Sequence, residues 1–160
     1  MGLDQYLHKQ IYIGGQYAEN KEEFINVKKG ERTIRIKVAD IESIRTEVCY
    51  WRKNYAINEW FLDKIQPEGD DNCIDFPIEK EWLYELTALL KNICDPNKTK
   101  KQVLEIVEDR IPTHSWFTIE SFKEDYDYYM DDFKDTLKKL EEIIKAPDFD
   151  EANFYYYIWY

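Results

Sequence analysis

The spacing of apolar residues changes along the chain, and this change constrains the fold more than any other feature. Residues 33–38 alternate strictly, with Ile34, Ile36 and Val38 separated by polar or charged residues, which is typical of a half-buried strand. From about residue 42 onward, apolar residues recur mainly every three or four positions, as in amphipathic helices. Both patterns occur without an internal repeat or a linker-like stretch. The sequence therefore predicts a single α+β domain over residues 1–160.

Segments rich in β-branched and aromatic residues are predicted to form strands. These segments are residues 5–13, 24–27, 33–38, 115–119 and 154–160. Gly14 and Gly15 follow the first segment as in a hairpin turn, so the N-terminal strands are expected to form an antiparallel meander. The expected sheet is small and antiparallel, and it combines the N-terminal strands, residues 115–119 and the C-terminal strand.

About four helices are expected to pack on this sheet. The first begins near Glu42 or Thr46 and ends at residue 65, and it is so widely apolar that it must be buried on most sides. A short segment, residues 74–78, leads to the next helix. Ser121 and Glu124 fit a capping box at the start of the last helix. The later helices are predicted at residues 79–94, 98–109 and 121–145.

The charge of the chain is −11, and it is uneven. Residues 1–65 hold 10 acids and 11 bases, residues 66–119 hold 11 and 6, and residues 120–160 hold 12 and 5. Direct binding to nucleic acid is not expected on such a surface, because affinity for phosphates comes from Lys and Arg. A basic protein groove or a cation is a better partner, although acidity also serves solubility alone.

The sequence also points to a cellular compartment. No apolar run approaches the ~20 residues of a membrane span, and the N-terminus lacks the pattern of a signal peptide. The three cysteines, Cys49, Cys73 and Cys94, are an odd number at wide spacing, which favours free thiols in a reducing cytoplasm. No phosphate loop, dinucleotide fingerprint or zinc-ligand spacing occurs. We therefore expect a cytoplasmic protein with no membrane contact, no cofactor and no metal.

Several distinctive motifs occur along the chain. They are Met1-Gly2-Leu3-Asp4-Gln5-Tyr6-Leu7, Tyr50-Trp51-Arg52-Lys53-Asn54, Ile57, Trp60-Phe61, Asp71-Asn72-Cys73, Ile111-Pro112-Thr113, Tyr126-Asp127, Tyr129, Asp132, Thr136 and the aromatic C-terminus. Together they resemble those of a group of bacteriophage and prophage proteins that has no assigned reaction. The resemblance covers most of the chain, but Asn58 stands where the group often has His, and Trp116-Phe117 replaces a Gly-led aromatic run. It implies a phage accessory protein rather than any particular reaction.

An aromatic and basic cluster in the first predicted helix is one candidate ligand site. Its aromatic rings could stack on a planar ligand, while its basic and amide groups bind phosphate or base edges. Successive helical positions diverge by about 100°, so the whole cluster cannot face one ligand. The alternative is that the aromatic residues pack in the core. The cluster comprises Trp51, Arg52, Lys53, Asn54, Tyr55 and Asn58.

An acidic row in the last predicted helix is a candidate partner-binding site. Asp127, Asp131 and Asp135 are spaced by four residues beside Asp132, so they share one side of a helix. Stacked carboxylates can hold a cation when other elements supply ligands, and they could imitate a row of phosphates. The alternative is a solvated outer face.

These features lead to three function hypotheses. The first is a non-catalytic phage protein that binds and inhibits a host nucleic-acid-binding defence protein, of the anti-CRISPR or anti-restriction type, in the cytoplasm of the infected host. The second is a protein that binds and sequesters a nucleotide signal through the aromatic and basic cluster. The third is an enzyme whose site the sequence does not reveal. The sequence leaves a homodimer open.

Overall fold

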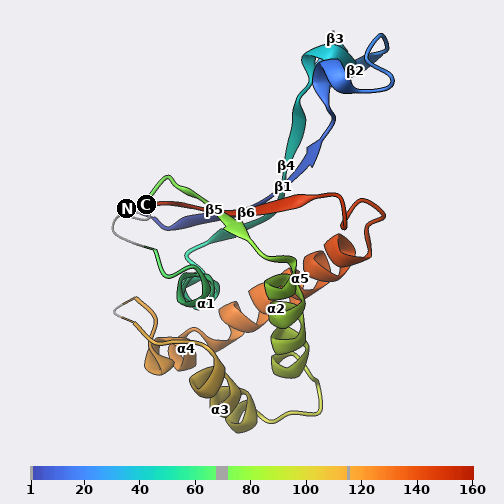
Figure 1. The fold of residues 1–160 in the computed structure, drawn as a ribbon. Helices are drawn as coiled ribbons and strands as arrows, with labels where there is room; N and C mark the ends of the chain where they lie inside the picture. Colours follow the sequence, from blue (N-terminus) through green and yellow to red (C-terminus); the bar gives the residue numbers. More distant parts are fainter. Residues whose placement is uncertain (1, 68–71, 115) are drawn as a thin grey trace.

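A four-stranded antiparallel sheet covered on one face by helices forms the body of the protein. The computed structural model describes residues 2–67, 72–114 and 116–160, and within them the predicted α+β class is confirmed. The strand order in the sheet is β4-β1-β6-β5, and Figure 1 shows the helices together below it. The strands are β1 (Asp4–Tyr12), β4 (Ser43–Arg52), β5 (Asp75–Ile78) and β6 (Asn153–Trp159).

The α-helices fill the space under this sheet. α2 packs against α5, and buried α5 side chains include Phe133 and Leu140. α3 starts with a capping box between Thr99 and Gln102, which satisfies two amide groups at its N-terminus. The predicted second, third and last helices are thus confirmed within a few residues, except that the last is divided. The described α-helices are α1 (Tyr55–Ile65), α2 (Lys80–Ile93), α3 (Lys100–Arg110), α4 (Ile119–Glu124) and α5 (Tyr126–Lys145).

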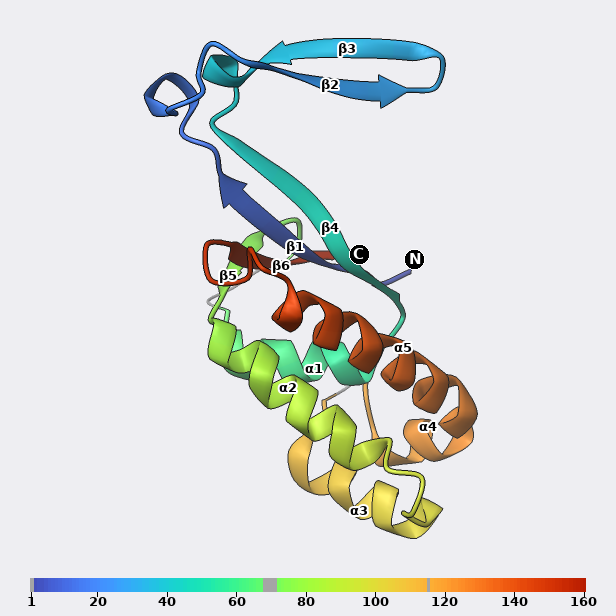
Figure 2. The ribbon, with the colours of Figure 1, turned by 90° about the vertical axis from the view of Figure 1, so that its right-hand side faces the viewer.

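The C-terminal strand β6 shows how the sheet separates core from surface. Phe154, Tyr156 and Ile158 are buried among the helices. Tyr155 and Tyr157 alternate with them and therefore point to the other face, which no helix covers in Figures 1 and 2. The aromatic C-terminus is consequently both core and surface, residue by residue.

The prediction of one long helix up to residue 65 is wrong in its first half. Residues 43–52 form strand β4, which pairs with β1 from Asp4 to Tyr12, and the helix α1 begins only at Tyr55. The alternation of Ile44, Thr46 and Val48 favours a strand, because β-branched residues fit a pleated surface. The broad apolar surface that suggested a buried helix belongs to a strand and a helix in succession.

The prediction of a strand at residues 115–119 is also wrong. His114 and Phe117 form an isolated bridge, and α4 begins at Ile119; residue 115 lies outside the described residues. Thr118, not Ser121, is the N-cap, and Ser121 provides the reciprocal hydrogen bond of the capping box. The fourth strand of the sheet is instead β5, which pairs with β6.

The N-terminal strands do not form a meander. β1 pairs with β4 and β6, whereas β2 (Phe24–Lys29) and β3 (Arg32–Lys37) pair with each other in a separate two-stranded sheet. Gly15 starts a 3₁₀ turn (η1, Gly15–Tyr17) in place of a tight hairpin, and a second 3₁₀ turn (η2, Val38–Asp40) returns the chain to β4. The three apolar residues expected on a buried face differ: Val38 is 3% exposed and Ile36 is half-buried, whereas Ile34 is 44% exposed.

We refer to residues 13–42, which contain β2 and β3, as the arm. Figures 1 and 2 show it beyond the ends of β1 and β4, on the side of the sheet opposite the helices. The sheet therefore has one face toward the helices and one open face beneath the arm. None of the described helices is long and apolar enough to cross a membrane.

Candidate functional site

The sequence from Trp51 to Asn58 forms the end of a strand, a turn and the start of a helix. Lys53 in the turn has a positive φ of 57°, and its amide donates to the Leu3 carbonyl at 2.8 Å. Asn54 caps α1, because its side-chain oxygen accepts from the Ile57 amide at 2.9 Å. The turn exposes Arg52 and Lys53 but buries their neighbours on either side.

The buried neighbours are held by hydrogen bonds to α5. The Trp51 indole donates to the Thr136 hydroxyl at 2.7 Å, and the Asn54 amide donates to the Asp132 carboxylate. The Gln5 side chain donates to the Asn54 carbonyl at 3.1 Å. These contacts fix the turn between β1 and α5, so Trp51 and Asn54 have structural roles beneath the surface.

Asp132 is influenced by this burial. Desolvation is the main effect and raises the pKa of its carboxyl above the ordinary value, while the hydrogen bond from Asn54 and the charge of Lys139 oppose the shift. Burial disfavours the charged form of an acid. Asp132 therefore differs from Asp127, Asp131 and Asp135, which are exposed on α5.

A second buried network supports α1 from the side of the sheet. The Tyr156 hydroxyl lies 3.0 Å from the side-chain oxygens of both Gln5 and Asn58. Its single proton is shared between two acceptors, and all three residues are at most 2% exposed. This network fixes the orientation of the Asn58 amide at the edge of a cavity.

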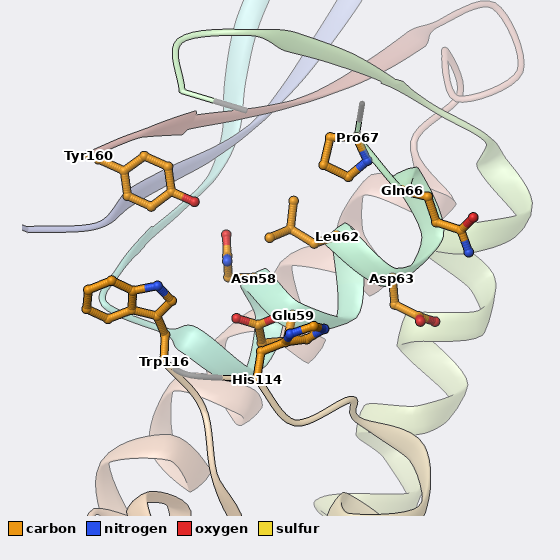
Figure 3. Close-up of a pocket in the computed structure, with 9 residues that line it drawn as sticks. All are labelled: Asn58, Glu59, Leu62, Asp63, Gln66, Pro67, His114, Trp116 and Tyr160. Atoms are coloured by element: carbon orange, nitrogen blue, oxygen red, sulfur yellow. The ribbon is translucent and has the colours of Figure 1, made fainter. Parts of the chain in front are cut away.

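The cavity beside α1 has a volume of about 500 Å³. Asn58 and Glu59 form its buried side, at 2% and 4% exposed. Figure 3 shows them on α1, across from Trp116 and Tyr160, with His114 on the segment that follows α3. We call it the Glu59 cavity; it is lined by Asn58, Glu59, Leu62, Asp63, Gln66, Pro67, His114, Trp116 and Tyr160.

A second cavity lies on the other side of Trp116, with a volume of about 680 Å³. Arg52 and Lys53 bring two positive charges to it, and the Tyr128 hydroxyl donates to the Arg52 carbonyl at 2.6 Å. We call it the Arg52 cavity; it is lined by Arg52, Lys53, Tyr55, Trp116, Ser121, Asp125, Tyr128 and Tyr129.

Trp116 connects the two cavities. Its ring stacks on Tyr55, with centroids 6.3 Å apart and planes inclined by 15°, yet the residue is 68% exposed. Both rings also line a small apolar hollow of about 210 Å³, together with Gly2, Leu3 and Tyr160. An aromatic side chain this exposed, at the edge of three hollows, offers a planar surface to a ligand.

The structure brings together only part of the predicted ligand cluster. Arg52, Lys53 and Tyr55 line the Arg52 cavity, and Asn58 lines the Glu59 cavity. Trp51 and Asn54 are in the core. Sequence analysis missed Trp116 and Glu59 as site residues, because their position beside α1 depends on how distant segments pack.

The acidic row is similarly divided. Asp127, Asp131 and Asp135 lie on the solvent side of α5, where Lys134 lies 3.3 Å from Asp131. Asp132 is turned toward Asn54. Among the described residues, no group of three or more His, Cys, Asp or Glu side chains is arranged to hold a metal ion.

Comparison of the chain with protein-family models, curated proteins and solved structures finds no match. The resemblance to phage proteins therefore stays a prediction from sequence motifs.

Proposed function

We propose that the protein binds a small molecule that carries both a planar ring and an anionic group, as a nucleotide does, in the cleft around Trp116. The observation that carries this proposal is the exposed indole of Trp116, stacked on Tyr55 between two cavities of different polarity. Volumes of about 500 and 680 Å³ fall in the range of ligand sites.

The polar groups around Trp116 suit the two parts of such a ligand. The ring would stack on the indole, which tolerates any base because every base has a π-face. The Arg52 and Lys53 side chains would bind the phosphate. On the other side, the Glu59 carboxylate would accept hydrogen bonds from the ring edge, and the Asn58 amide nitrogen would donate one.

The phage resemblance suggests a role for this binding. A phage protein that holds a nucleotide signal would lower its free concentration in the cytoplasm of the infected host, and so inhibit a defence system that depends on it. The protein would then act without catalysis.

Nucleotide binding can be tested with intrinsic fluorescence and isothermal titration calorimetry, using a panel of mononucleotides and cyclic dinucleotides. Trp116→Ala should weaken binding about 5- to 150-fold, since stacking on one aromatic ring contributes about 1–3 kcal/mol. Trp159→Ala is the matched control, because Trp159 is also exposed, at 53%, but lines neither cavity.

A second pair of variants separates stacking from charge. Arg52→Ala with Lys53→Ala should weaken binding of phosphorylated compounds more than of the corresponding nucleosides. If no compound of the panel binds, or if Trp116→Ala binds as tightly as the wild type, the proposal is wrong. Melting curves of each variant check that the fold is intact.

The exposed acidic row supports a second candidate function, inhibition of a basic host protein. Asp127, Asp131 and Asp135 are solvent-facing on one helix, where carboxylates could imitate phosphates toward a nucleic-acid-binding defence protein. Asp131→Lys with Asp135→Lys should then abolish inhibition in a host defence assay while leaving nucleotide binding unchanged. Inhibition that survives this charge reversal would exclude the acidic row.

A further inference from the structure

The arm has an apolar face that is partly exposed, because Ile25 and Ile36 are half-buried whereas Val27 and Ile34 are exposed. The register pairs Ile25 with Ile36 and Val27 with Ile34, so these four side chains lie on the same face. Val27 and Ile34 are 42% and 44% exposed. An isolated two-stranded hairpin is marginally stable in water, and an aliphatic face on one indicates a partner.

The opposite face of the same hairpin is built differently. Phe24 and Arg35 lie on it, and the Arg35 guanidinium is 3.9 Å from the centre of the Phe24 ring. Asn26 and Thr33 share this face. The hairpin therefore has one polar face and one aliphatic face.

The β2-β3 hairpin is basic, although the arm as a whole holds six acids and six bases. Residues 24–37 hold five bases and one acid, a charge of +4. Since the whole chain carries −11, the remainder carries −15. Two β2-β3 hairpins would therefore repel each other, whereas carboxylates on the open sheet face of another copy would attract a hairpin.

The open face of the sheet carries aromatic rings together with charged groups, including Arg45, which is paired with Asp75 and lies over the Tyr155 ring. Tyr6 contacts Tyr50 and Tyr157, with ring centroids 5.2 and 5.9 Å apart. Tyr155 and Trp159 extend this face along β6. The Asp4 carboxylate accepts a hydrogen bond from Tyr50 at 2.6 Å, and Glu47 lies opposite His8 in the register. Aromatic rings with carboxylates beside them suit an aliphatic, basic hairpin.

We propose that this protein forms a two-fold symmetric homodimer in which the arm of each copy packs its aliphatic face on the open sheet face of the other. Arm and open face lie on the same side of the sheet (Figures 1 and 2), so two copies can enclose each other's arms reciprocally. A two-fold interface uses the same patches twice, which doubles the apolar area buried by a short hairpin. This proposal does not depend on nucleotide binding.

Light scattering after size exclusion tests the dimer directly. The wild type should elute with twice the chain mass of 19.5 kDa. Val27→Asp with Ile34→Asp should halve that mass. The matched control is Asn26→Asp with Thr33→Asp, which makes the same charge change on the other face of the hairpin and should leave the dimer intact.

Carbodiimide cross-linking identifies the contacting surfaces, because it joins lysines to carboxylates without a spacer. In a mixture of isotopically light and heavy copies, we expect links from Lys29, which shares the aliphatic face of the hairpin, to Asp4 or Glu47 of the other copy. A monomeric wild type would overturn the proposal, as would a dimer that survives Val27→Asp with Ile34→Asp. Links between arm lysines and Glu31 of another arm would overturn it as well.

Discussion

Ile57 in α1 and Ile34 in the arm are the same residue in opposite surroundings. Ile57 is 0% exposed under the sheet, whereas Ile34 is 44% exposed. Fully burying such a side chain stabilises a fold by about 1.5–3 kcal/mol, so Ile57 is explained by the stability of one chain. Ile34 gains little from folding, and neither does Val27 opposite it, which is 42% exposed. This difference teaches that the body is a folding unit, while the arm's aliphatic residues require a partner for their explanation.

The cleft around Trp116 combines exposed side chains with buried ones that hold them in place. Its ligand-facing groups, Arg52 and Lys53, are exposed, but they stand between Trp51 and Asn54, which are buried and hydrogen-bonded to α5. A site held in this way is preorganised, because its side chains project from a turn that the core fixes. The β2-β3 hairpin of the arm, by contrast, forms a sheet separate from that of the body.

We expect the body and the arm to differ most in the free energy of unfolding when Ile57→Ala is compared with Ile34→Ala. Ile57→Ala should lower the free energy of unfolding by about 2–5 kcal/mol, because it removes buried contacts and leaves a cavity. Ile34→Ala should lower it by about 0.5 kcal/mol or less, as is usual for surface substitutions. Urea denaturation followed by circular dichroism measures both, at concentrations low enough to keep the protein monomeric. Equal losses in the two variants would mean that the arm belongs to the folding unit.

The sequence predicted those elements whose own pattern decides their structure. The apolar period predicts α2 and α3 within a few residues, and the β-propensity of the aromatic C-terminus predicts β6 equally well. The sequence predicts a helix over most of residues 43–52, because a run of apolar and aromatic residues fits a buried helix as well as a strand. Pairing with β1 decides between the two, and pairing is a long-range interaction.

The candidate site was predictable only in part for the same reason. The Trp51 to Asn58 stretch was recognised from its unusual composition, yet which of its residues face a ligand depends on a turn at Lys53. Trp116 and Glu59 lie 57 positions apart in the sequence and meet at one cavity. No local sequence pattern indicates that Trp116 and Glu59 line the same cavity. The exposure of Ile34 is equally unpredictable from the sequence, because strict alternation predicts that its face is buried.

An intermediate effect is expected from Tyr156→Phe, which tests the network beneath the cleft. Loss of the hydroxyl leaves the side-chain oxygens of Gln5 and Asn58 without this donor, and an unsatisfied buried group costs about 1–3 kcal/mol. Tyr155→Phe, on the open face of the sheet, is the matched control and should change the free energy of unfolding by less than about 0.5 kcal/mol. If both variants melt alike, the buried network does not distinguish the two faces of β6.

Asp132→Asn should have a small, electrostatic effect on the pH dependence of stability. Burial raises the pKa of Asp132 above its ordinary value of 3.8, so the folded state binds a proton more tightly than the unfolded state. The stability contributed by this group is therefore fully present below the unfolded pKa and is lost as the pH rises through the folded pKa. Asn at this position does not titrate, and its oxygen can still accept from Asn54.

Asp132→Asn should consequently gain stability relative to the wild type as the pH rises from about 4 to neutrality. Because Asp132 is only partly buried and Lys139 lies near it, the gain should stay below about 1 kcal/mol. Asp131→Asn removes one negative charge from the exposed side of the same helix, so comparing the two variants isolates the contribution of burial. Thermal melts at several pH values between about 3 and 8 measure the difference. This range includes the titration of a carboxyl group whose pKa is raised. Asp132→Asn could instead lose stability relative to the wild type toward neutral pH. The hydrogen bond from Asn54 to the charged carboxylate would then stabilise the fold by more than desolvation of the carboxylate costs. In that case charge, as well as hydrogen bonding, would hold the turn beneath the cleft.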